Sequence, residues 1–180
     1  WWHKKLEKSK ITAIINEIIK NEDLTTGNYT KNYERNICKY LNAKFCVAVS
    51  NGSMANLLAF LALGVKTNDE VVIPNIGWIS VINACKIIGA KPVIVDVEKN
   101  RPIIDASKIK AVISKKTKVI FPVYMNGRSA NIEQILKICK KNKIFLVEDA
   151  AQAMGIRYKK KFLGTYGDVG IFSTSATKMM

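Results

Sequence analysis

Short apolar runs alternate with helical segments along most of this chain, and this alternation restricts the possible folds more than any other feature. The predicted strands are Phe45–Val49, Val71–Pro74, Pro92–Val95, Val119–Val123, Ile144–Val147 and Val169–Phe172. The predicted helices between them are Ser53–Leu63, Gly77–Ile88, Ala106–Ile113 and Ile132–Lys141. Because strands that alternate with helices form a mostly parallel sheet covered on both faces, the sequence predicts an α/β fold, a three-layer sandwich.

Two further helices are predicted before the first apolar run. The first has isoleucines at the spacing of an amphipathic helix, and we interpret its apolar face as core packing; these residues are Ile11, Ile14, Ile15, Ile18 and Ile19. A polar loop follows at Asn21–Asn28. Thr30 is expected to cap the second helix, which has apolar residues on one face at Tyr33, Ile37 and Leu41.

Composition indicates a single soluble core. A length of 180 residues with 48% hydrophobic content suits one domain of about 100–200 residues. The sequence has no apolar run long enough to span a membrane, and its N-terminus, WWHKKLEKSK, has no apolar segment of a signal peptide. We therefore expect a cytoplasmic protein without a membrane partner.

The cysteines and the charge give weaker indications. The four cysteines lack C-x-x-C spacing and His3 is the single histidine, so we expect reduced thiols and no metal site. The formal charge is +15, but the lysines gather only in small groups at 115–118, 137–143 and 159–161, without interleaved aromatic residues. We interpret them as a solvated surface rather than a nucleic-acid site, although a positive field also suits an anionic substrate.

Two acids directly follow the apolar run Ile144–Val147. Ligands of open α/β sheets bind at the carboxyl ends of strands, so Asp149 lies where chemistry is usually found. Glu148 points to the opposite face of the strand, and we expect it to form a structural ion pair. On the residues alone, Ser53 is an N-cap serine and Trp78 a core residue.

Two motifs in the last part of the chain resemble the DegT-type sugar aminotransferases, a family of fold-type I enzymes that use pyridoxal 5'-phosphate (PLP). The motifs are E-D-A-A-Q-A at 148–153 and G-D-x-G-x-F-S-F-x-x-x-K at 167–178, with Thr174 in place of the usual Phe. The resemblance extends from about Leu24 to the end. It implies an N-terminal helix and loop at residues 1–30 and an aspartate aminotransferase-like PLP-binding large domain at residues 31–180. Because family members are much longer and have a C-terminal small domain, we expect a fragment.

The same resemblance implies the residues that bind the cofactor. These are Gly52, Ser53, Trp78, Asp149, Ala151, Gln152, Ser173 and Lys178. By resemblance, Lys178 forms the Schiff base and later acts as the general base, and Asp149 keeps the ring nitrogen protonated. The resemblance also implies that Gly52, Ser53 and Ser173 bind the phosphate. Gly52 and Ser53 lie at a predicted helix N-terminus, which favours an anion.

The remaining implied contacts concern the cofactor ring. Trp78 stacks on one face, Ala151 packs against the other, and Gln152 hydrogen-bonds the ring hydroxyl. The implied reaction converts a keto sugar, nucleotide-linked, to an amino sugar with glutamate or glutamine as the donor. The implied setting is polysaccharide or secondary-metabolite sugar biosynthesis, by a homodimer with shared active sites.

Alternatives to an aminotransferase stay open at this point. A PLP-dependent sugar dehydratase on the same fold is disfavoured, because the family's dehydratases carry His where this chain has Lys178. The chain could also be a non-catalytic PLP-fold fragment or a basic binding module. A Rossmann dehydrogenase is weaker still, because no G-x-G-x-x-G follows a predicted strand.

Overall fold

The computed structural model of the protein describes residues 7–21, 27–175 and 177–178. The chain divides into two compact units, residues 1–48 and residues 49–180. His3 and most of the predicted polar loop at Asn21–Asn28 lie outside the described residues. The two units are described separately below.

The first unit contains helices α1 (Lys8–Lys20) and α2 (Asn28–Leu41). Helix α2 begins two residues before the predicted cap, with Gly27 in extended backbone at the N-cap position. The expectation that Thr30 caps this helix is therefore wrong, because Thr30 already has helical backbone. The helix ends at Asn42, whose left-handed backbone (φ 53°) stops it.

The isoleucine face of α1 is not part of a core. No residue of this helix is buried, and Ile19 remains 60% exposed. The interpretation of this face as core packing is wrong, because no described element of the first unit covers it. An amphipathic pattern shows that a face favours an apolar partner, but it does not show where that partner lies.

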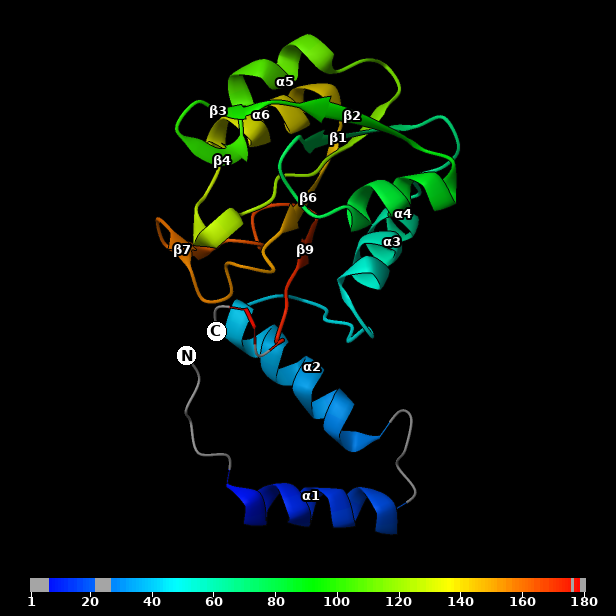
Figure 1. Cartoon of the computed structure of the whole chain (residues 1–180), viewed down its shortest axis with the longest axis vertical. Helices are drawn as coiled ribbons and strands as arrows, with labels where there is room; N and C mark the ends of the chain where they lie inside the picture. The colour runs from blue at the N-terminus through cyan, green and yellow to red at the C-terminus, as the bar shows by residue number, and fades with distance from the viewer. Residues whose placement is uncertain (1–6, 22–26, 176, 179–180) are drawn as a thin grey trace. The chain divides into compact units, whose positions relative to one another are not determined.

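The second unit is built on one parallel sheet with strand order β2-β1-β5-β6-β9 (Figure 1). Every neighbouring pair in it runs parallel, which confirms the predicted architecture. The strands are β1 (Glu70–Pro74), β2 (Lys91–Val95), β5 (Thr117–Ile120), β6 (Phe145–Asp149) and β9 (Val169–Ile171).

Helices and two small hairpins complete the second unit. The helices are α3 (Gly52–Ala62), α4 (Ser80–Ile88), α5 (Ala106–Val112), α6 (Ile132–Asn142) and the single 3-10 turn η1 (Met125–Gly127). The hairpins are β3 (Val97–Glu98) with β4 (Arg101–Ile104) and β7 (Arg157–Tyr158) with β8 (Lys161–Phe162).

The sheet divides the apolar core into two layers, because alternate residues of a strand point to opposite faces. In β1, Val71 and Ile73 join the cluster that packs under α3 and α4, whereas Val72 joins the cluster under α5 and α6. In β6, Val147 and Leu146 divide in the same way. The predicted three-layer sandwich is therefore present.

Two predicted elements differ from the structure. Phe45–Val49 belongs to no strand, and its side chains are exposed, Phe45 to 86%, except for the half-buried Cys46. An extended segment becomes a strand only when a neighbour satisfies its backbone groups, and no described strand pairs with this one. Helix α4 begins at Ser80 rather than Gly77, and in the loop before it the amide of Asn75 donates to Val95 O of β2 at 2.8 Å.

The cysteines are all free thiols, as expected for reduced residues. Burial raises the pKa of Cys85 to about 11 and that of Cys139 to about 12, so both stay protonated at neutral pH. Among the described residues, no helix combines the length and apolar character that a membrane crossing requires.

The first testable prediction concerns the close backbone packing around β9. A Cβ atom on Gly170 would lie 1.8 Å from the carbonyl oxygen of Gly164, and neither backbone can move aside cheaply. We expect Gly170→Ala to lower the free energy of unfolding by about 3 kcal/mol in urea titrations. Gly77→Ala is the matched control, since its Cβ would meet only the side chains of Val123 at 3.6 Å and Pro74 at 4.0 Å. Equal stability of the two variants would contradict this packing.

Candidate active site

Strand β6 sends its two acids to opposite faces of the sheet. Asp149 follows Val147 by two residues and therefore points to the α3/α4 side, while Glu148 points to the α5/α6 side. The backbone of Asp149 is fixed on both sides, because its N–H donates to Pro122 O at 3.0 Å and its carbonyl accepts from the amide of Tyr124 at 3.0 Å. The carboxyl end of β6 is thus held rigidly in place.

The carboxyl group of Asp149 is poorly compensated. Burial raises its pKa, and the Ala151 amide, which donates to Oδ1 at 3.0 Å, and the positive charge of Lys178 offset this only in part. Within the part of the chain described, Asp149 forms no salt bridge. A carboxylate in this position favours a further cationic partner on its open side.

Lys178 and Ser173 follow β9 on the same part of the chain. Ser173 is half-buried, and its hydroxyl accepts from the amide of Ser175 at 3.3 Å. The chain then turns, with the amide of Lys178 bonded to Ser175 O at 2.9 Å. Because the charge of Lys178 acts on Asp149, the structure brings these two predicted residues into one neighbourhood.

The N-terminus of α3, which packs against β9, is open. Asn51 is its N-cap, and the Asn51 side chain accepts from the amide of Met54 at 3.1 Å. The expectation that Ser53 is the N-cap is wrong, because Asn51 already satisfies that donor. The amides of Gly52 and Ser53 have no hydrogen-bond partner among the described residues, and a Cβ on Gly52 would meet nothing within 4 Å. Free amides at a helix N-terminus favour an anion.

Trp78, Ala151 and Gln152 complete the predicted set. Trp78 is 74% exposed in the loop after β1, so the expectation that it is a core residue is wrong. Ala151 is half-buried just after β6. Gln152 accepts from the amide of Asn126 at 2.9 Å, and its own amide nitrogen has only the sulfur of Met125 at 3.7 Å, which is a weak acceptor.

Glu148 was misjudged from the sequence. Its side chain has no exposed surface, and it accepts from the Tyr124 hydroxyl and from three backbone amides of the 164–167 loop. The expected ion pair is therefore wrong, because uncharged donors take the place of a basic residue. The glycines of this loop were the available signal, since backbone amides reach a buried acid most easily where side chains are small.

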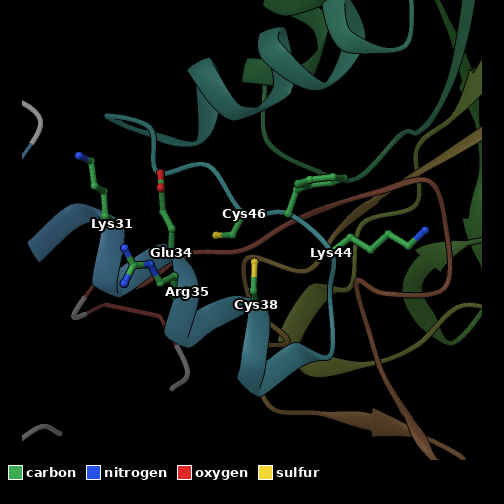
Figure 2. A pocket seen from close by; sticks show the side chains of 7 residues that line it. Lys31, Glu34, Arg35, Cys38, Lys44 and Cys46 are labelled. Atoms are coloured by element: carbon green, nitrogen blue, oxygen red, sulfur yellow. The ribbon is translucent and has the colours of Figure 1, made fainter. Parts of the chain in front are cut away.

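A separate hollow of about 380 Å³ lies within the first unit, between α2 and the segment that follows it (Figure 2). Its lining residues are Lys31, Glu34, Arg35, Cys38, Lys44, Phe45 and Cys46. None of them belongs to the predicted site. Burial, and to a smaller extent Cys38 and Glu34, raise the pKa of Cys46, so its thiol is not activated. The described residues also include no cluster that could hold a metal ion.

A parallel α/β sheet with an open acid, a lysine and a free helix N-terminus at its carboxyl edge is the arrangement of a phosphate-bearing cofactor site. The chain belongs to the DegT/DnrJ/EryC1/StrS aminotransferase family, whose sequence profile matches residues 5–180.

Individual relatives agree with this assignment. The chain is 38% identical over 152 residues to GDP-perosamine synthase of Escherichia coli O157:H7, covering 84% of this chain and 42% of that protein. An aminotransferase from Psychrobacter cryohalolentis superimposes with a TM-score of 0.90 at 27% identity, covering 100% of this chain and 46% of the other.

A dehydratase also matches. E. coli GDP-4-keto-6-deoxy-D-mannose-3-dehydratase with bound hydrated PLP has a TM-score of 0.82 at 33% identity, over 88% of this chain and 42% of that one. The chain thus spans less than half the length of the relatives it matches.

A stability prediction follows from the raised pKa of Asp149. The folded state binds a proton at this carboxyl more tightly than the unfolded state, so stability falls as pH rises from the unfolded pKa through the folded pKa. We therefore expect Asp149→Asn to stabilise the cofactor-free protein at pH 7 in thermal melts, with the gain vanishing at acid pH below both values.

Asp105→Asn is the control with the opposite sign. Hydrogen bonding to Ser107 lowers the pKa of Asp105, so its charged form contributes stability at pH 7 that the amide loses. Destabilisation by both substitutions at pH 7 would contradict the environment described for Asp149.

Proposed function

We propose that this chain forms the PLP-binding part of a sugar aminotransferase. One observation carries the proposal: a partly buried carboxyl at the end of a central strand lacks an ion pair and feels the charge of Lys178. The family to which the chain belongs and the PLP bound in a related dehydratase structure support the same cofactor.

The available groups fit the phosphate of PLP. The free amides of Gly52 and Ser53 point from the start of an 11-residue helix, whose dipole favours a negative charge. The hydroxyl of Ser53 adds a donor, and we assign the Ser173 hydroxyl as a second one. The room around the Cα of Gly52 lets the phosphate approach the backbone closely.

The other groups fit the ring. PLP, when bound, supplies the electron sink of the reaction. Asp149 holds a proton at the ring nitrogen, and that cation compensates the burial that raises the pKa of Asp149. The exposed indole of Trp78 is free to stack on one face of the ring, with Ala151 at the other. The weakly bonded amide nitrogen of Gln152 is free to donate to the ring hydroxyl.

Lys178 supplies the reactive amine. A lysine holds PLP covalently through its side-chain nitrogen, and once released from the cofactor the same nitrogen can accept and return a proton. Its half-buried position after β9 keeps this amine near Asp149. We assign Lys178 as the anchor and general base, and Asp149 as the residue that orients and charges the ring.

For the substrate, we propose a nucleotide-linked keto sugar, with glutamate or glutamine as the amino donor. The similarity to GDP-perosamine synthase supports a sugar nucleotide, and the formal charge of +15 suits an anionic substrate. We further propose a cytoplasmic homodimer. Exposed apolar residues of the second unit, such as Leu61, Ile79 and Ile87, support an association surface.

A dehydratase is the second candidate, because an E. coli sugar dehydratase shares 33% identity and the fold. The presence of Lys178 favours the aminotransferase. The two are separated by incubating the full product of the reading frame that encodes this chain with PLP, glutamate and a panel of nucleotide keto sugars. A product in which an amino group replaces the keto oxygen identifies an aminotransferase. A keto sugar that has lost one further hydroxyl group identifies a dehydratase.

The assignment of Lys178 is tested by borohydride reduction in the presence of PLP, followed by peptide mapping of the full product. We expect the pyridoxyl group on the peptide that contains Lys178, because the other lysines described are remote from Asp149 or exposed. The Lys178→Arg variant keeps the charge and is expected to lose the label. Labelling of another lysine in the unaltered protein would show that the anchor is wrong.

The phosphate site is tested with Ser53→Asp and its uncharged counterpart Ser53→Asn. A carboxylate at the start of α3 would repel the phosphate, so we expect PLP to bind at least about tenfold more weakly to the Asp variant, by fluorescence titration. The Asn variant has the same shape without the charge and is expected to bind nearly as the parent does. Equal affinities of both variants would mean that the phosphate lies elsewhere.

A further inference from the structure

We infer that Glu148 is a positioning residue: it fixes the loop Leu163–Asp168 on β6 and thereby sets where Ser173 and Lys178 lie relative to Asp149. The inference rests on the proposed PLP site and adds a residue to it that makes no contact with the cofactor. It is carried by the hydrogen bonds of one buried carboxylate.

The carboxylate of Glu148 accepts four hydrogen bonds. Oε2 accepts from the Tyr124 hydroxyl at 2.6 Å and from the amide of Gly164 at 3.0 Å. Oε1 accepts from the amides of Tyr166 and Gly167, both at 2.6 Å. Three amides of one short loop thus converge on a single side chain of β6.

The charged form of Glu148 suits this arrangement better than a neutral side chain of the same shape. All three backbone partners can only donate, so the NH2 group of an amide side chain in this place would face one of them as a second donor. Burial raises the pKa of Tyr124, which therefore stays protonated and is available to donate as well. A fully buried charge without a basic partner is stabilised only by such convergent donors.

The loop lies directly on the strand that it contacts. Asp168 binds β6 twice, through its carboxylate to the amide of Leu146 at 2.8 Å and through its own amide to Leu146 O at 2.9 Å. A Cβ on Gly167 would come within 2.4 Å of Leu146 O, so only glycine permits this approach. Glu148 holds the middle of the loop and Asp168 holds its end.

The loop leads straight into the proposed site. Strand β9 begins at Val169 and pairs with β6 so that Asp149 lies opposite Ile171. The chain then leads to Ser173 and Lys178. Ser173 therefore follows the fixed loop after one short strand and one further residue, and Lys178 comes five residues after Ser173. Glu148 and Asp149 are adjacent in β6. If the loop detaches from Glu148 and the strand rotates, Asp149 rotates with it.

The decisive variant is Glu148→Gln in the full product of the reading frame. The Gln side chain can accept two of the amides but sets its NH2 group against a third donor, so the loop loses part of its attachment. We expect amide hydrogen exchange at 164–167 to become about tenfold faster and PLP to bind about tenfold more weakly. At saturating PLP, the visible circular dichroism of the bound cofactor is expected to change, because its ring sits differently beside Asp149.

Glu70→Gln is the matched control. Glu70 also accepts two hydrogen bonds as a carboxylate, from the hydroxyls of Ser114 and Thr117, but it lies at the amino end of β1, away from the site. This variant is expected to lose stability while keeping the parent's PLP affinity and visible dichroism. A merely structural role of Glu148 would give the same result for Glu148→Gln, which would overturn the inference.

Tyr124→Phe covers the case in which Glu148→Gln does not fold. It removes one donor and leaves the carboxylate with three amides, so we expect a smaller weakening of PLP binding, about threefold, with a change in visible dichroism. A folded Tyr124→Phe with parental affinity and dichroism would then overturn the inference. If the unaltered protein does not bind PLP, the proposed function fails, and loop exchange in the variants still tests the attachment by Glu148.

Discussion

The arrangement of the second unit depends on one strand with two adjacent acids, β6, whose Glu148 and Asp149 face opposite layers. One acid is buried and surrounded by donors, and the other is left without an ion pair at the edge of the sheet. The first ties the following loop to the sheet, and the second remains available for a ligand. Two neighbouring residues with the same functional group thus lie in opposite environments, separated only by the alternation of a strand.

The acid pair also shows how environment decides the role of a residue type. Glu148 has as many donors as its oxygens can accept, so nothing remains for a ligand to bind. Asp149 has only one described amide donor and the charge of Lys178 near it, and these do not offset the burial that raises its pKa. Poorly compensated groups of this kind gather at functional sites, where a bound molecule supplies the missing partner.

Most of the sheet and its helices could be predicted from the sequence, because burial on both faces gives continuous apolar runs and each helix has its own period. The strand at Phe45–Val49 could not be judged correctly, since pairing depends on a neighbour that local sequence does not name. The interpretation of the α1 isoleucines as core residues was wrong for the same reason. Their amphipathic pattern is present, but no described element of the first unit covers them. In both cases the local sequence did not show whether a second segment packs against or pairs with the predicted element.

The site residues divide differently. Asp149 was singled out by its place at the end of a strand, whereas the other proposed cofactor contacts came from the resemblance to a family. Asn51 was missed as the cap of α3 because it and Ser53 are both good N-cap residues, and only the backbone decides which side chain reaches Met54. Three of the four donors to Glu148 are backbone amides, which almost every residue type has, so these hydrogen bonds became visible only in the structure.

The strand order has a bearing on how the protein forms during synthesis. Strands β2, β1, β5 and β6 all precede residue 150, so most of the sheet can assemble while the chain is still being made. Strand β9 pairs only with β6, and Ser173 and Lys178 follow it. Ser173 and Lys178 are therefore made after the strands that carry the rest of the candidate site, and a nascent chain exposes the edge of β6 and the carboxyl of Asp149 until β9 has been made.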